Sequence, residues 1–333
     1  MKYGHIEGVD KPISRLVQGT MMFSTAEEEY SFDLLDTVFE TGINTFDCGH
    51  IYGGGDCERV LGRWIEDRGF RKEVVILTKG CHHNADRRRV TPFDISADLY
   101  DSLARLRTDH LDLYLLHRDD PRKAVGPIVD TLNHYIQDGR IGVIGGSNWS
   151  HDRIRKANIY AEANGLQPFD VSSPNFSLAD QAEPPWAECI SISGADGEEA
   201  RAWYQENKIP LFTWSSIANG FFTGKVSRDN CKQLVEDGIL DGSSAKSYCT
   251  PDNFKRLDRV EILAKEKKMT IPQIALAYVL SQPLNIFPLV GARSGDEITA
   301  NLQSLDTTLT QDEMAWLDLK SSQKPASMKS AKR

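Results

Sequence analysis

Short apolar runs alternate with longer amphipathic stretches along most of the chain. Several runs, such as VVIL and LYLL, are continuously apolar, which is typical of strands buried on both faces of a parallel sheet. The runs that predict strands cover residues 13–20, 43–47, 74–79, 111–117, 141–148, 169–175, 209–215 and 285–292.

The stretches between these runs carry apolar residues at helical spacing. One of them places Ile95, Leu99, Leu103 and Leu106 on a single face. Another ends at Gly42, a residue type that commonly terminates helices. The predicted helices cover residues 31–42, 57–69, 94–108, 125–139, 150–165, 198–208, 253–268 and 271–282.

Eight strands that alternate with helices indicate parallel strands joined by crossover helices. Eight such units fit a closed (β/α)₈ TIM barrel better than an open doubly wound sheet, whose first strand precedes a GxGxxG turn that is missing here. We therefore predict an α/β barrel domain over residues 1–320, with an N-terminal β-hairpin at its bottom. Residues 321–333 are basic and are expected to form a flexible tail.

Two segments, 174–196 and 216–253, interrupt the alternation and are rich in Ser, Gly, Pro and Asp. We predict that they are long loops at the C-terminal face of the barrel. Long loops on a rigid scaffold usually serve function, so they would shape the substrate site.

Net charge and the lack of long apolar runs exclude some classes of protein. The formal net charge of −9 argues against nucleic-acid binding, and the lack of an 18-residue apolar run or a signal peptide predicts a cytoplasmic protein without a membrane span. We expect a monomer or small homo-oligomer.

The cysteines show no CxxC pair and are expected to be reduced thiols, neither disulfides nor zinc ligands: Cys48, Cys57, Cys81, Cys189, Cys231 and Cys249.

Ionisable residues close three of the apolar runs. Asp47, Lys79 and His117 each end a predicted strand, and Tyr52 follows in the turn GHIYGGG. Each alone has an ordinary structural explanation, but catalytic residues of TIM barrels lie at the C-terminal ends of strands. Together they would bring a carboxylate, an ammonium, an imidazole and a phenol to one rim.

This set suits carbonyl reduction, in which a hydride leaves negative charge on the carbonyl oxygen and a proton donor must neutralise it. A tyrosine has a pKa of about 10, and a nearby ammonium such as Lys79 would lower that pKa. Asp47 would balance the charge of Lys79, because an isolated buried charge is unfavourable. His117 would orient or polarise the carbonyl oxygen.

The motifs NTFDCGHIYGGG, VVILTKG and LDLYLLHRDD resemble, in this order, those of the aldo-keto reductase superfamily, and the resemblance runs from about residue 12 to 320. It implies that Tyr52 is the general acid, that Lys79 and Asp47 tune it and that His117 orients the substrate. It also implies a nicotinamide cofactor bound without a Rossmann fold and without a metal ion.

The same resemblance implies a set of cofactor contacts. Ser147 and Asn148 match the pair that holds the carboxamide, and Trp214 matches the residue that stacks on the nicotinamide. Arg293 suits a 2′-phosphate through forked, charge-assisted hydrogen bonds, which predicts NADPH. The remaining predicted contacts are Thr20, Asp47, Ser215, Ile217, Ala218, Asn219, Lys225, Gly291, Glu297 and Asn301.

The sequence departs from the family pattern near the nicotinamide. Ser173 and Phe176 stand where a glutamine and a tyrosine are usual, so the carboxamide would be held differently. Gly146 replaces the more usual valine. Candidate walls of the substrate pocket are Met21, Met22, Phe23, Trp149 and Trp186.

The leading hypothesis is NADPH-dependent reduction of a small aldehyde or ketone. One alternative is a cofactor-binding regulatory protein with little turnover, resembling potassium-channel β subunits; those typically lack the histidine, so His117 favours a reductase. A second is a barrel aldolase or hydrolase with Lys79 as a Schiff-base nucleophile. A zinc hydrolase is less favoured, because adjacent His82 and His83 on a strand would point to opposite faces.

Overall fold

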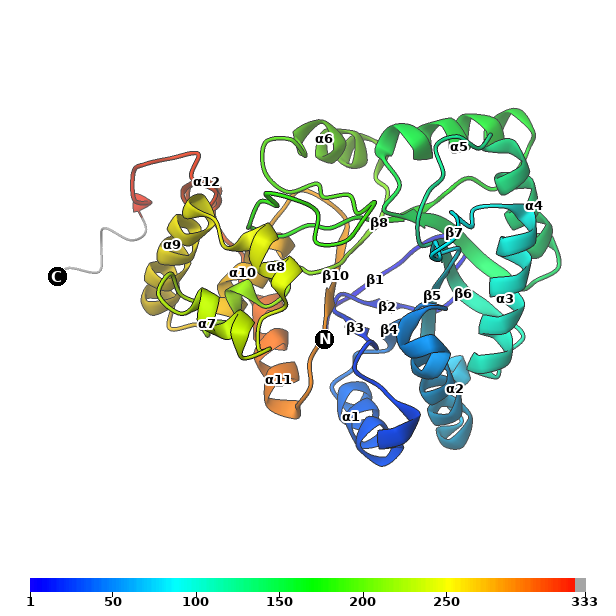
Figure 1. Ribbon diagram of the computed structural model, residues 1–333, viewed down its shortest axis with the longest axis horizontal. Helices are drawn as coiled ribbons and strands as arrows, with labels where there is room; N and C mark the ends of the chain where they lie inside the picture. Colours follow the sequence, from blue (N-terminus) through cyan, green and yellow to red (C-terminus); the bar gives the residue numbers. More distant parts are fainter. Residues whose placement is uncertain (327–333) are drawn as a thin grey trace.

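A computed structural model describes residues 1–326 and confirms the predicted barrel. The strands close in the order β10-β3-β4-β5-β6-β7-β8-β9, and every neighbouring pair is parallel (Figure 1). The barrel strands are β3 (Val17–Gly19), β4 (Thr45–Asp47), β5 (Val75–Gly80), β6 (Leu111–Leu116), β7 (Ile141–Ser147), β8 (Val171–Ser173), β9 (Leu211–Thr213) and β10 (Ile286–Val290).

Helices surround the strands (Figure 1), and each predicted helical stretch overlaps one helix. α3 begins at Pro92, two residues before the predicted start, because the Thr91 side chain accepts a hydrogen bond from Asp94 N and proline suits the first helical position. The helices are α1 (Glu28–Glu40), α2 (Asp56–Arg68), α3 (Pro92–Leu106), α4 (Gly126–Gln137), α5 (His151–Ala163), α6 (Glu198–Asn207), α7 (Cys231–Glu236), α8 (Gly242–Tyr248), α9 (Pro251–Lys267), α10 (Ile271–Leu280), α11 (Gly295–Gln303) and α12 (Gln311–Leu317).

The first apolar run of the sequence is divided between two elements. Its beginning forms β2 (Ile13–Ser14), which pairs antiparallel with β1 (Tyr3–Gly4), and its end forms β3 of the barrel. The predicted N-terminal hairpin is therefore present. Its apolar side chains join the inner-facing strand residues in one buried cluster: Ile6, Val9, Ile13, Val17, Val75, Leu77, Leu113, Leu115, Val143, Val171, Phe212 and Phe287.

The two predicted long loops differ in structure. Residues 174–196 form an irregular loop with isolated bridges from Asn175 to Ser191 and Trp214. The prediction of a loop over 216–253 is wrong in part, because α7, α8 and the start of α9 lie within it. Local caps explain these helices: the Asp241 carboxylate accepts hydrogen bonds from two main-chain N–H groups at the start of α8, and Thr250 caps α9.

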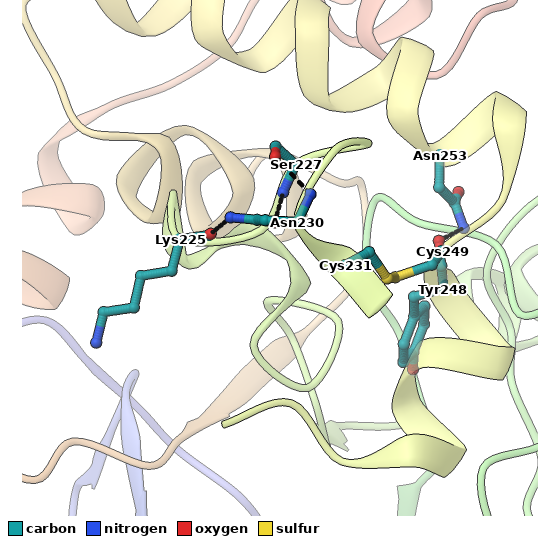
Figure 2. The surroundings of a disulfide bond; sticks show 7 residues. All are labelled: Lys225, Ser227, Asn230, Cys231, Tyr248, Cys249 and Asn253. Carbon is teal, nitrogen blue, oxygen red and sulfur yellow. Dashed lines mark hydrogen bonds between the residues drawn. A yellow bond between two sulfur atoms is a disulfide. The ribbon is translucent and has the colours of Figure 1, made fainter. Parts of the chain in front are cut away.

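The expectation that all cysteines are reduced is also wrong. Cys231 and Cys249 form a disulfide between the start of α7 and the residue after α8 (Figure 2). Contacts between these two short helices bring the sulfur atoms together across 18 residues of sequence. The free cysteines are Cys48, Cys57, Cys81 and Cys189.

Within residues 1–326, no helix has both the length and the apolar character needed to cross a bilayer. The first residues of the predicted tail contact the barrel: Ser321 O accepts a hydrogen bond from Arg259 (2.8 Å), and Lys324 lies 3.6 Å from Glu266. Residues 327–333 lie outside the described part of the chain, so a domain boundary at residue 320 stays a prediction.

The disulfide predicts how many thiols are free. Protein unfolded without reductant should titrate as four thiols, and protein treated with a reductant as six. Substituting both Cys231 and Cys249 with serine should lower the free energy of unfolding by about 3 kcal/mol, because the unfolded chain regains the entropy of an open loop. Urea denaturation with and without reductant measures this, and six thiols before reduction would contradict the pairing.

Candidate functional site at the barrel mouth

Strand periodicity directs two ionisable side chains to the inner face of the barrel. Leu77 on β5 and Leu115 on β6 belong to the cluster inside the barrel. Side chains of a strand alternate between faces, so Lys79 and His117, two residues further on, point the same way at the C-terminal mouth. The alternation that builds the core thus also carries polar groups to its upper end.

Asp47 and Tyr52 reach the same mouth from β4 and the turn after it. Tyr52 begins a short helical turn in which Gly53 and Gly54 have φ values of 56° and 62°, a left-handed conformation that suits glycine. A Cβ at Gly49 would lie 3.2 Å from the Tyr52 ring, so glycine there leaves room for the phenol. The glycine-rich turn therefore sets the position of the tyrosine.

The four side chains meet in one buried cluster. The Lys79 ammonium is paired with the Asp47 carboxylate and donates hydrogen bonds to Cys48 O (3.1 Å) and to the Tyr52 hydroxyl (3.3 Å). The Tyr52 ring lies edge-on to the His117 ring, with centroids 5.4 Å apart. Lys79 and Asp47 are 2% and 3% exposed, so water does not screen their interaction.

Burial strengthens the preference of the Tyr52 phenol for its protonated form. Desolvation raises the pKa of Tyr52 by more than the Lys79 ammonium lowers it, so the phenol stays protonated at neutral pH. This differs from the sequence expectation of a lowered pKa. For Lys79, desolvation lowers the pKa, but the interactions with Asp47 and Tyr52 raise it by more. The net result is a pKa above the ordinary value. Lys79 therefore remains an ammonium.

His117 is a neutral imidazole. Burial, and next the positive charges of Lys79 and Arg118, lower its pKa well below the ordinary value. Its Nδ1 atom is buried and has no hydrogen-bond partner within the described residues. The His82 ring packs against it at a centroid distance of 4.9 Å, and burial lowers the pKa of His82 to about 4. The mouth thus combines one ion pair with neutral hydrogen-bonding groups.

Beside this cluster, the residues expected to hold a carboxamide are engaged within the protein. Ser147 Oγ donates to Ser173 O (3.1 Å). Asn148 Nδ2 donates to His117 O (3.3 Å), while Asn148 Oδ1 accepts a hydrogen bond from Ile190 N (3.1 Å). The Ser173 hydroxyl, which stands where a glutamine is usual, is buried without a partner in residues 1–326. This end of the site therefore holds one buried hydroxyl that no described residue satisfies.

The segment after β9 carries several residues in an unfavourable backbone conformation. Ser215, Ala218 and Asn219 have φ values of 52°, 55° and 47°. Such non-glycine residues often cluster at functional sites, where surrounding contacts hold them. The neighbouring Trp214 has a buried Nε1 without a partner in the described chain, and its ring centroid is 5.8 Å from that of Trp186.

Two predicted cofactor residues are cations to which residues 1–326 supply no ion-pair partner. Neither Lys225 nor Arg293 forms an ion pair with any described residue. Figure 2 shows the Lys225 side chain extending away from the disulfide, while its main-chain oxygen accepts a hydrogen bond from Asn230. Arg293 precedes α11, and its main-chain N–H donates to Glu297 Oε2 (2.8 Å). A helix N-terminus beside a free guanidinium favours an anion.

The remaining predicted contacts are scattered around the mouth. The Thr20 hydroxyl donates to Asp47 O (3.0 Å), and Ile217 packs on the outer core. Gly291 follows β10 and Asn301 lies within α11. Among the described residues, no hydrogen bond or ion pair links Arg293, Glu297 or Asn301 to the cluster around Tyr52.

Sequence reasoning missed the roles of two side chains that adjoin the cluster. His82 was considered only as a metal ligand, yet its ring packs against His117. Arg118 is buried next to His117. Its position directly after a buried strand was the sequence signal that could have revealed it. Within residues 1–326, no three His, Cys, Asp or Glu side chains gather in a group that could hold a metal ion.

A closed parallel barrel with a buried ion pair, a phenol and an imidazole at its C-terminal mouth has the architecture of a TIM-barrel enzyme. The model of the Aldo/keto reductase family matches residues 15–321, and the chain belongs to this family.

Relatives among curated proteins cover most of the chain. It is 26% identical over 330 residues to norsolorinic acid reductase of Aspergillus flavus, covering 92% of this chain and 77% of the relative. It is also 26% identical to aryl-alcohol dehydrogenase [NADP(+)] of Phanerodontia chrysosporium, with 88% and 76% covered. A crystal structure of a thermostable aldo-keto reductase with the inhibitor epalrestat shares the fold, with a TM-score of 0.71, 22% identity and 96% and 100% coverage.

The buried ion pair predicts a characteristic pattern of stability. Lys79→Met should lower the free energy of unfolding by about 3–5 kcal/mol, because it leaves the Asp47 carboxylate buried without a partner. Adding Asp47→Asn removes that charge, so the double variant should recover most of the loss. Urea denaturation of both variants measures this, and equal stabilities would argue against a charged Asp47 in the folded protein.

Proposed function

We propose that the protein reduces an aldehyde or ketone to an alcohol with NADPH. The observation that carries the proposal is the Lys79 ammonium, which is held by Asp47 and donates a hydrogen bond to the Tyr52 hydroxyl beside the His117 ring. A phenol in this environment is a proton donor next to a fixed positive charge. Membership of the Aldo/keto reductase family supports the same chemistry.

In this mechanism Tyr52 donates its proton to the carbonyl oxygen as negative charge develops there. The ammonium of Lys79 stabilises the tyrosinate that remains, and Asp47 keeps that ammonium in place. His117 is neutral, so its ring N–H can donate a hydrogen bond to the carbonyl oxygen without competing for the proton. The nicotinamide cofactor, when bound, supplies the hydride.

The residues around the mouth fit such a cofactor. The Ser173 hydroxyl and Trp214 Nε1 are buried polar atoms that lack partners, and a polar ligand would satisfy them. We assign the nicotinamide end to Thr20, Asp47, Ser147, Asn148 and Trp214. The pyrophosphate is assigned to Ser215, Ile217, Ala218, Asn219 and Lys225, and the adenosine end to Gly291, Arg293, Glu297 and Asn301.

Two observations favour NADPH over NADH. Arg293 presents a guanidinium without a carboxylate partner in the described chain, beside the N-terminus of α11. In addition, one relative is named for NADP(+).

The names of the relatives indicate a substrate class, because they refer to aryl alcohols and to norsolorinic acid. We therefore propose aromatic or aliphatic carbonyl compounds as the substrate class.

Removing the phenol tests the mechanism. Tyr52→Phe should lower kcat for carbonyl reduction by about 10²- to 10⁴-fold, because the proton donor is lost, while NADPH still binds. A carbonyl panel followed at the NADPH absorbance band measures turnover, and fluorescence titration measures binding. Tyr204→Phe is the control, because its buried hydroxyl contacts Ser172 outside the cluster.

If Tyr52→Phe kept most of its activity, the assigned donor would be wrong. If the unaltered protein oxidised bound NADPH once but showed no steady turnover on any carbonyl, the regulatory alternative would replace the reductase.

Arg293 tests the cofactor assignment. Arg293→Ala should raise the NADPH dissociation constant about 10-fold or more while leaving that of NADH nearly unchanged, because only the 2′-phosphate loses a charge-assisted hydrogen bond. Arg140→Ala, at the opposite end of the barrel before β7, is the control. Equal losses for both cofactors would remove Arg293 from the phosphate site.

A further inference from the structure

Arg118 is a buried cation held by neutral acceptors. It directly follows His117 and is 5% exposed. Its Nη1 donates to His117 O (2.9 Å), its Nε donates to Ala187 O (3.3 Å), and its Nη2 lies 3.5 Å from Cys189 Sγ. Among residues 1–326 it has no ion-pair partner, although a buried charge is usually paired. Its contacts instead join two main-chain segments.

The main chain of His117 is held from several sides. His117 O also accepts a hydrogen bond from Asn148 Nδ2 (3.3 Å), and Asn148 Oδ1 accepts one from Ile190 N (3.1 Å). The Trp149 indole donates to Arg118 O (3.0 Å). The 186–190 segment of the long loop is therefore tied to the catalytic strand end through two side chains that both bond to His117 O.

The same segment forms part of the wall of the mouth. Trp186, at its start, lies beside Trp214, the residue assigned to the nicotinamide. Trp186 is 42% exposed, so part of its indole is accessible to solvent. Glu188 has a φ of 62° and pairs with Arg88 of the loop after β5. Side-chain contacts from other parts of the chain therefore fix the conformation of the 186–190 segment.

We propose that Arg118 is a positioning residue that holds the His117 main chain and the 186–190 segment in one fixed arrangement for carbonyl reduction. This inference rests on the proposed function. Arg118 fixes the imidazole relative to Tyr52 and keeps Trp186 over the substrate side of the mouth. Substrate position and imidazole position are therefore set together.

A guanidinium suits this role because its planar, forked donors reach the two main-chain oxygens and Cys189 at once, which a lysine ammonium cannot do with the same geometry. Its charge has a second effect. Together with burial and Lys79, it lowers the pKa of His117, so the imidazole stays neutral.

The test compares Arg118→Gln, Arg118→Lys and the control Arg153→Gln. Arg153 lies near the same strand end, but it pairs with Asp119 (3.0 Å) and does not contact the 186–190 segment. The measurements are kcat and KM for a carbonyl substrate, NADPH binding, the pH profile, and hydrogen–deuterium exchange of residues 186–190.

Arg118→Gln should lower kcat by about 10- to 100-fold, because small displacements of catalytic groups have effects of this size, and NADPH binding should persist. Exchange in the 186–190 segment should rise. The acidic limb of the pH–activity profile should also shift to higher pH, because loss of a nearby positive charge raises the pKa of His117. Arg118→Lys keeps the charge, so it should raise exchange while leaving the acidic limb in place.

A kcat and an exchange rate unchanged from the parent in Arg118→Gln would overturn the proposal, as would equal effects in Arg153→Gln. If Arg118→Gln does not fold, Arg118→Lys decides by the same two measurements. If the parent protein reduces no carbonyl, the proposed function fails. Increased exchange in the Arg118 variants would then still support the role of Arg118 in holding the 186–190 segment.

Discussion

The buried ion pair between Lys79 and Asp47 is the constraint on which the mouth of the barrel depends. A lysine with 2% exposure needs a nearby carboxylate, and adjacent parallel strands β4 and β5 supply one. The pair then presents an N–H to the Tyr52 hydroxyl from inside the fold. The glycine-rich turn after β4 completes the arrangement, because Gly49 leaves room for the phenol ring and Gly53 and Gly54 adopt a left-handed conformation directly after Tyr52.

Burial around this pair acts in opposite directions on its neighbours. It raises the pKa of Tyr52 and lowers the pKa of His117, so both groups are neutral near neutral pH. A neutral donor beside a fixed ammonium suits proton delivery to a developing oxyanion. The cluster lies above a buried apolar core that the inner-facing strand residues and the hairpin form together. The outer parts of the site instead come from loops held by side-chain contacts.

Much of the fold was predictable because the hydrophobic period differs between strands and helices. The eight runs, the hairpin and the polar residues at Asp47, Lys79 and His117 all follow from local pattern. The short helices α7 and α8 were missed, since they depend on caps such as Asp241 and on packing against neighbours rather than on a long amphipathic repeat. The disulfide was missed for the same reason, because Cys231 and Cys249 meet only through those helices.

The sequence by itself determined which residues end the strands and which face of each strand they share, because alternation is a local property. Tertiary structure alone decided the direction of the Tyr52 pKa shift, because desolvation depends on residues distant in sequence. It also decided that Asn148 and Arg118 both bond to the carbonyl of His117 while holding residues 187–190. These contacts join strand ends to loop residues 69 and 42 positions away along the chain, and no local pattern encodes such a meeting.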